Sequence, residues 1–176
     1  MERHEKAIMF VLEKEGGYQA HPEDTGNYNS KGELVGTNFG ISAKVYEKYI
    51  GRVPGEDDIR NMPIAHAIEI YKKRYWDPVG GDLIKSYSVA LAMFDWFVNA
   101  GRPAIMSMQK VLRIRQDGIV GKQTIHHINQ YEPEWLFNAY KKERIEWYKR
   151  LVDRKPRLLK FFRGWMNRIN SITFQD

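Results

Sequence analysis

Two carboxyl residues and a hydroxyl residue near the start of the chain have types and spacing that suit acid catalysis: Glu15, Asp24 and Thr37. Glu15 ends an apolar helical stripe, so burial and the negative end of the helix dipole both disfavour its charged form. Asp24 lies in a polar loop, where a carboxylate stays ionised. Two carboxyl groups in contrasting environments are what cleavage of a glycosidic bond requires. From spacing alone, the simpler interpretation of Glu15 is a surface glutamate before a glycine cap.

The elements that position these residues are mostly helical. Apolar residues at Ile8, Val11 and Leu12 predict an amphipathic helix over residues 4–15, which the glycines at 16 and 17 end. Residues 18–40 are rich in Gly, Asn, Asp and Ser, and predict a long loop with a short β-hairpin around residues 30–34. Further helices are expected after Ser42, over residues 63–76, 89–101 and 133–153, and in the segments RPAIMSMQKVLRIRQDG, KQTIHHINQY and RLLKFFRGWMNRINSI. The fold class is therefore mainly α.

Three segments around the candidate carboxyl groups, EGGY (15–18), HPEDTG (21–26) and TNFGIS (37–42), resemble glycoside hydrolase family 108. That family comprises N-acetylmuramidases of phage and prophage endolysins and related bacterial proteins. The likeness continues through IYKKRYW, LAMFDWFVNAG and FFRGWMNRI, and so covers nearly the whole chain. It implies a lysozyme-like fold with a small β-hairpin or long loop after the first helix. It also implies cleavage of the β-1,4 bond between N-acetylmuramic acid and N-acetylglucosamine, with Glu15 as catalytic acid, Asp24 as second carboxylate and Thr37 as a water-positioning hydroxyl.

The loop that carries Asp24 departs from the family pattern. Ala20 and His21 stand where the family has Asn-Asp, Asn27 replaces the second glycine of a Gly-Gly pair, and extra residues precede Thr37. These departures keep open a second class of function, a non-catalytic wall-binding or secretion-associated protein. Within the enzyme class, a lytic transglycosylase would cleave the same bond with its catalytic glutamate alone.

A second group of polar residues lies in the segment MQKVLRIRQDGIVGKQT, at 108–124. It resembles the signature of peptidoglycan-binding three-helix modules, which implies that Gln109, Asp117 and Thr124 contact the wall polymer. The alternative is that these residues only build a helix–loop–helix turn. We therefore expect a lysozyme-like catalytic region over residues 1–95 and a helical peptidoglycan-binding-like region over residues 96–176, packed as one compact unit.

Four further residues are expected to contact substrate. Tyr18 can stack on a sugar ring, because its side chain is flat and amphipathic. Asn38 belongs to the TNFGIS segment. Asp95 and Asn99 lie four residues apart on the most apolar helix and so share one face. They line the floor of the cleft or, as the alternative, support a neighbouring loop.

One arginine falls on an apolar stripe. Arg144 shares that stripe with Tyr140, Trp147 and Tyr148. A buried guanidinium needs an acceptor, which Asp95 or the surroundings of the catalytic glutamate can supply. The alternative is that its charged end reaches the solvent by snorkelling.

Composition limits the remaining classes of function. The chain has 176 residues, 43% of them hydrophobic, and a formal net charge of +6. The charge favours anionic partners, namely nucleic acid, an anionic membrane or anionic cell-wall polymers, and does not choose among them. The resemblance implies peptidoglycan, with anionic wall polymers as a further partner. The basic residues are dispersed and no nucleic-acid readout motif occurs, so no nucleic-acid partner is expected. The chain has no cysteine and its histidines lack metal-ligand spacing, so we expect no metal site and no cofactor.

The sequence also sets an expectation for where the protein acts. No apolar run is long enough to span a membrane, and the first residues lack the pattern of a signal peptide. We therefore expect a monomer that is synthesised in the cytoplasm. It would act at the cell wall after release by a holin-type pore or another route.

Overall fold

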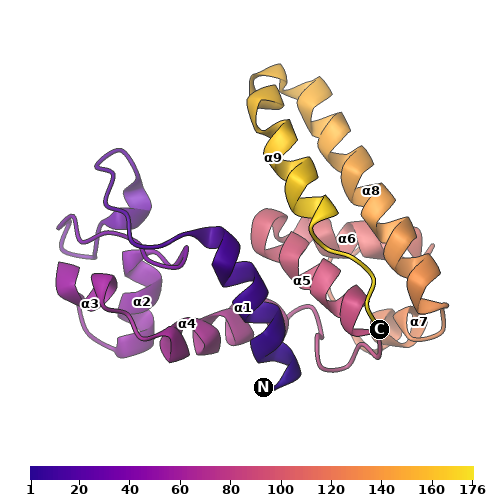
Figure 1. Cartoon of the computed structure of the whole chain (residues 1–176), viewed down its shortest axis with the longest axis horizontal. Helices are drawn as coiled ribbons and strands as arrows, with labels where there is room; N and C mark the ends of the chain where they lie inside the picture. Colours follow the sequence, from indigo (N-terminus) through magenta and orange to yellow (C-terminus); the bar gives the residue numbers. More distant parts are fainter. The chain divides into compact units, whose positions relative to one another are not determined.

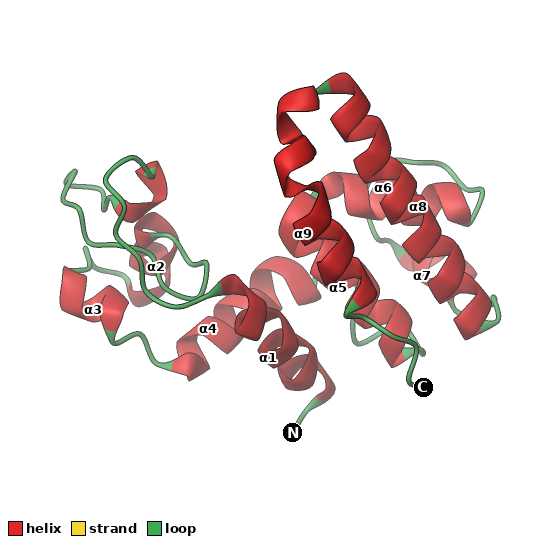
Figure 2. Cartoon of the chain, turned by 45° about the horizontal axis from the view of Figure 1, so that its top comes forward, coloured by secondary structure: helices red, strands yellow, loops and turns green.

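The structure is a computed structural model that describes residues 1–176, and the chain divides into two compact units, Met1–Arg74 and Tyr75–Asp176. Both units are built of helices joined by loops, without a sheet (Figure 2). The predicted mainly α class is confirmed. None of the helices combines the length and the apolarity that crossing a bilayer requires.

The first unit contains four α-helices and a short 3-10 turn. They are α1 (Arg3–Glu15), η1 (Thr25–Asn27), α2 (Ala43–Ile50), α3 (Glu56–Arg60) and α4 (Ile64–Tyr71), labelled in Figure 1 except for the short turn. Helix α1 forms where the apolar stripe predicts it: Ile8 and Val11 are fully buried, and α1 packs against α4. It ends because Gly16 takes a φ of 79°, in the left-handed region that favours glycine.

A long loop follows α1 and is held by three isolated antiparallel bridges. They pair Gln19 with Thr37, Tyr28 with Leu34, and Asn38 with Ile41. The predicted hairpin around residues 30–34 is present as the middle bridge, which encloses the turn over residues 29–33. The bridge between Gln19 and Thr37 joins the start of the loop to its end. The two sides of the segment with the extra residues before Thr37 are therefore fixed to each other.

The second unit is a helical bundle around α5. Its elements are α5 (Tyr87–Ala100), α6 (Arg102–Val111), α7 (Lys122–Ile128), α8 (Pro133–Arg154), η3 (Pro156–Leu158) and α9 (Leu159–Asn170), and a π-helical turn, η2 (Lys72–Trp76), precedes them. Helix α5 is buried on almost every side between residues 88 and 96 and packs against α6 and α8. Helices α8 and α9 lie side by side in both views (Figures 1 and 2).

Some element boundaries differ from those expected. The predicted division after residue 95 falls inside α5, whereas the compact units divide between Arg74 and Tyr75, so the functional division stays a prediction. The helix expected over residues 63–76 is α4 followed by η2. Helix α3 was not predicted, because five residues are too few to show a hydrophobic period.

Candidate active site

Glu15 is the last residue of α1, and its side chain is half-buried. Its Oε2 atom lies 3.3 Å from the position that a Cβ would occupy on Gly40. The hydroxyl of Tyr71 lies 3.0 Å from that same position. The carboxyl group therefore sits at the negative end of α1, against the backbone of Gly40 and in the neighbourhood of a phenol.

The backbone beside Glu15 is a tight two-residue turn. Asn38 and Ile41 exchange backbone hydrogen bonds of 3.3 and 2.8 Å, and between them Phe39 and Gly40 take φ values of 52° and 69°. Positive φ at both central residues defines a type I′ turn, which is rare for a phenylalanine. The Tyr71 hydroxyl donates to the Phe39 carbonyl at 2.8 Å and so holds the turn in place.

Two residues that were predicted to contact substrate, Asn38 and Tyr18, make their contacts with other residues of the first unit. Asn38 is 5% exposed, and its amide donates to the carbonyls of Ile59 and Arg60 at the end of α3, at 3.0 and 3.1 Å. The Arg60 guanidinium lies 4.0 Å above the Tyr18 ring, and a Cβ on Gly36 would come within 2.4 Å of that ring. Both side chains therefore anchor the loop, and their contact with substrate stays a prediction.

A fully buried asparagine links the other two candidate catalytic residues. The Oδ1 of Asn27 accepts from the Thr37 hydroxyl and, at 3.1 Å, from Gln19. Its Nδ2 donates to Gln19 Oε1 and to the His21 carbonyl, at 2.8 and 3.0 Å. The Gln19 amide also donates to Asp24 Oδ2 at 2.9 Å. Two side-chain amides thus connect Asp24 to Thr37. The sequence analysis did not predict the central place of Asn27, because nothing in a polar loop shows which asparagine is buried.

The hydrogen bonds of Asp24 and Thr37 restrict what each can do. The Oδ1 of Asp24 accepts from the Gly26 backbone N–H at 2.9 Å and caps η1, and the side chain is exposed. Both carboxylate oxygens therefore have a partner within the loop. Thr37 donates its single hydroxyl proton to Asn27, so its oxygen is left as an acceptor. That arrangement suits a hydroxyl that orients a water molecule.

Substitution of the turn glycine should reveal how tightly Glu15 is held. We expect Gly40→Ala to lower the rate of peptidoglycan cleavage roughly tenfold, because the new methyl group presses on Tyr71 and on the Glu15 carboxyl group. The rate would be measured by release of soluble fragments from purified peptidoglycan.

Gly51 offers a matched control for this variant. It has a φ of 71°, and nothing lies within 4 Å of the Cβ position. Gly40→Ala and Gly51→Ala should both lose about 1–2 kcal/mol of unfolding free energy from the left-handed backbone. Equal losses of activity in the two variants would show that stability, and not the position of Glu15, explains the effect.

The second predicted constellation forms one buried network in the second unit. Gln109 is 1% exposed, and its amide donates to Asp117 Oδ1 at 2.7 Å and to the Ile119 carbonyl at 3.0 Å. Its Oε1 accepts from Gly118 N–H at 2.9 Å, and Thr124 donates to the Ile119 carbonyl at 3.4 Å. The bond from Gln109, followed by one from the Ile119 N–H, lowers the pKa of Asp117. The structure therefore brings the three predicted residues together. Their hydrogen bonds hold the turn over residues 117–119, and their contact with the wall polymer stays a prediction.

Removing the central amide should destabilise the second unit. We expect Gln109→Leu to cost about 1–3 kcal/mol, because it leaves the Gly118 N–H without its partner and Asp117 without its main donor. Gln123→Leu, at an exposed position on α7, is the control and should change stability little. All five tryptophans lie within residues 75–176, so tryptophan fluorescence in urea follows this unit alone. Equal urea midpoints for Gln109→Leu and Gln123→Leu would contradict the inference that Gln109 holds the turn.

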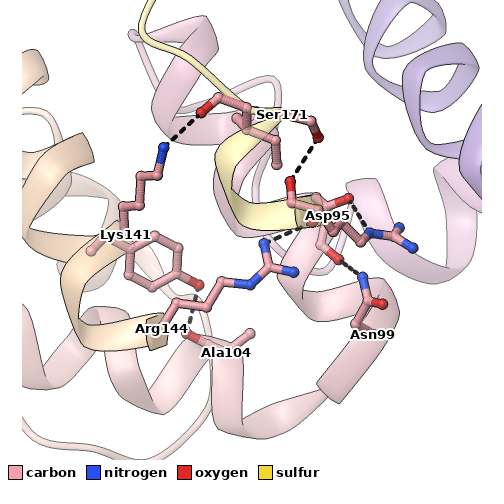
Figure 3. A network of polar contacts seen from close by, with 9 residues as sticks. Asp95, Asn99, Ala104, Lys141, Arg144 and Ser171 are labelled. Carbon is pink, nitrogen blue, oxygen red and sulfur yellow. Dashed lines mark hydrogen bonds and ion pairs between the residues drawn. The ribbon is translucent and has the colours of Figure 1, made fainter. Parts of the chain in front are cut away.

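The last two predicted contacts belong to an ion cluster on α5 (Figure 3). Asp95 is fully buried and accepts from Arg144 at 2.7 Å and from Arg168 at 2.9 Å. Asn99 is exposed at the surface and donates to the Asp95 backbone carbonyl at 2.6 Å. Of the acceptors considered for Arg144, Asp95 is therefore confirmed. Contact of Asp95 or Asn99 with substrate stays a prediction.

Comparison with known proteins gives two family matches. Residues 8–101 match the model described as Glycosyl hydrolase 108, and residues 103–170 match one described as a Predicted Peptidoglycan domain. Twelve chains of solved structures match. One of them, the structure of Brucella abortus SagA, has 28% sequence identity and a TM-score of 0.74, with 96% of this chain and 90% of that chain covered. No curated protein matches. The resemblance of both halves of the chain is confirmed.

Proposed function

The chain belongs to the glycosyl hydrolase 108 family, and from that premise we propose that it is an N-acetylmuramidase with Glu15 as its general acid. Family membership makes it a glycoside hydrolase, and the second match makes peptidoglycan its partner. The bond proposed is the β-1,4 linkage between N-acetylmuramic acid and N-acetylglucosamine. The observation that carries the proposal is the half-buried carboxyl group at the end of α1, which lies against Gly40 and near the Tyr71 hydroxyl.

The proposed reaction uses the contrast between the two carboxyl residues. Glu15 gives its proton to the glycosidic oxygen as the bond from that oxygen to the anomeric carbon breaks. Asp24, in the exposed loop, stabilises the positive charge that develops on the sugar or accepts a proton from the attacking water. Thr37 orients that water through its free acceptor, because its proton is donated to Asn27. The water oxygen then bonds to the anomeric carbon, with inversion of configuration, and its released proton passes to Asp24 or, where Asp24 only stabilises charge, to the solvent.

One observation favours a second candidate, a lytic transglycosylase. Both oxygens of Asp24 already accept hydrogen bonds, from Gln19 and from Gly26. In this second candidate Asp24 therefore stabilises the loop and takes no part in the reaction. Glu15 would then work alone. It would protonate the leaving oxygen and afterwards accept the proton of the muramic acid 6-hydroxyl as that hydroxyl attacks the anomeric carbon.

Analysis of the products separates these possibilities. Purified peptidoglycan would be digested with the full chain, reduced with borohydride and examined by mass spectrometry. The N-acetylmuramidase predicts reducible N-acetylmuramic acid ends. A transglycosylase predicts 1,6-anhydro ends, which are lighter by one water and are not reduced. If the folded protein releases no fragments but sediments with the polymer, the enzyme assignment fails and the wall-binding alternative holds.

A further inference from the structure

The turn that joins α8 to α9 has an unusual composition. We call residues 154–166 the α8–α9 tip; they include the end of α8, all of η3 and the start of α9 (top of Figure 1). The sequence RKPRLLKFFRGWM carries five cations and no acid. It also contains no serine, threonine, asparagine, glutamine, tyrosine or histidine. The tip therefore offers positive charge and apolar surface, but no side-chain acceptor.

The tip cations are exposed and take no part in the ion pairs of the second unit. These cations are Arg154, Lys155, Arg157, Lys160 and Arg163. On α8, Glu143 pairs with Lys110 and Arg150, and Glu146 pairs with Lys149. Asp153, directly before the tip, is exposed and forms no ion pair with the tip cations. The positive charge of the tip is thus available to an external anion.

Apolar side chains lie among these cations at the surface. Leu159 is 62% exposed and Phe161 is 48% exposed. Arg157, Leu158, Lys160 and Phe161 line a surface concavity of about 250 Å³. The Lys160 ammonium lies 5.0 Å from the Phe161 ring centre, so charge and apolar surface are interleaved. Exposed leucine and phenylalanine beside unpaired cations is the pattern of a segment that lies in a membrane interface.

We propose that the α8–α9 tip docks on the surface of a membrane that contains anionic phospholipids. Leu159 and Phe161 enter the boundary between head groups and acyl chains, while Arg157, Lys160 and Arg163 face lipid phosphates. Phosphate oxygens accept hydrogen bonds, and the polar side chains of the tip can only donate them. A glycan presents hydroxyl donors as well as acceptors, and its binding sites normally supply both kinds of partner. The absence of side-chain acceptors therefore favours an anionic phosphate over a glycan. The exposed Leu159 and Phe161 favour a lipid surface over an anionic wall polymer.

Vesicle co-sedimentation of the full chain tests this proposal. The protein should sediment with vesicles of mixed phosphatidylcholine and phosphatidylglycerol, and not with phosphatidylcholine alone. Each cation near an anionic surface strengthens binding several-fold, so Arg157→Gln/Lys160→Gln should weaken partitioning by at least about tenfold. Leu159→Ser/Phe161→Ser should also weaken it, because the apolar anchor is lost.

Matched controls separate the tip from general charge and general apolarity. Lys44→Gln/Lys48→Gln removes two exposed cations from α2, which line another concavity, of about 440 Å³. Leu83→Ser/Ile119→Ser removes side chains that are 65% and 67% exposed elsewhere in the second unit. Both control variants should bind anionic vesicles like the unaltered chain. Unchanged far-ultraviolet circular dichroism would show that the tip variants are folded.

Three results would overturn the proposal. They are failure of the unaltered chain to bind anionic vesicles, retained binding by both tip variants, and an equal loss in the control variants. Sedimentation with membrane-free peptidoglycan provides the other comparison: if the tip variants lose that binding and the chain ignores vesicles, the tip is a wall contact. Cleavage of membrane-free peptidoglycan should stay unchanged in the tip variants. Failure of the lipid proposal is therefore distinct from failure of the proposed enzyme.

Discussion

Glu15→Gln is expected to lower the rate of peptidoglycan cleavage by at least ~100-fold, the usual scale for loss of a general acid. The amide keeps the size of the side chain but has no acidic proton to give to the glycosidic oxygen. Glu15 is at the surface end of α1 and not in its apolar core, so the fold should persist. The measurement is release of soluble fragments from purified peptidoglycan, with circular dichroism to show that the helices remain.

Glu13 provides a matched control on the same helix. It lies two residues earlier in the sequence and is exposed, so Glu13→Gln removes the same charge from the same helix end. That variant should keep the activity of the unaltered chain. If Glu15→Gln also retains most of the activity, the assignment of Glu15 is wrong and the acid lies elsewhere. If both variants lose it equally, the helix end needs its charge but no particular carboxyl group is the acid.

Much of the fold could be predicted because it follows from periodic apolar positions. The stripe that includes Ile8 and Val11 forms α1, and the most apolar segment forms the buried α5. Helix α3 could not be found in this way, since only Ile59 among its residues is buried. Its signals were local: acidic residues in the first turn and Arg60 in the last.

The candidate site could be predicted as a set of residues but not as a set of contacts. The TNFGIS segment drew attention to Thr37, yet it is Gly40 of that segment that lies against Glu15, with the Tyr71 hydroxyl of α4 in the same neighbourhood. A turn of type I′ at Phe39 and Gly40 could have been suspected from the glycine, but not which side chain it faces. Sequence spacing does not show which polar side chain a fold buries, and so Asn27 was noticed only as a replacement for glycine.

The buried ion cluster on α5 leads to the second large expected effect. Asp95 is 0% exposed and is the acceptor for both Arg144, which is 3% exposed, and Arg168. The Nε of Arg144 is buried and has no hydrogen-bond partner. Asp95 is the carboxylate that pairs with the buried Arg144 guanidinium and compensates its charge. Removing one member of a buried pair costs more than the pair itself contributes, because the other charge remains buried.

Asp95→Asn should therefore destabilise the second unit by about 3–5 kcal/mol. The substitution keeps the shape of the side chain, removes its charge and replaces one of its two acceptor oxygens by an amide donor. Arg144 is then left uncompensated in the core. Urea unfolding followed by tryptophan fluorescence would measure the loss, because every tryptophan lies in this unit. Asp153→Asn, at an exposed position on α8, is the matched control and should stay within about 0.5 kcal/mol of the unaltered chain.

A double variant tests whether uncompensated charge is the cause. Asp95→Asn/Arg144→Met removes both members of the buried pair, and a neutral core of similar volume is often as stable as the pair it replaces. The double variant should therefore be more stable than Asp95→Asn alone. The cleavage rate of the folded Asp95→Asn protein addresses the predicted substrate contact: an unchanged rate means that Asp95 supports the bundle only. If Asp95→Asn is as stable as Asp153→Asn, the carboxylate does not compensate Arg144, and the account of the cluster is wrong.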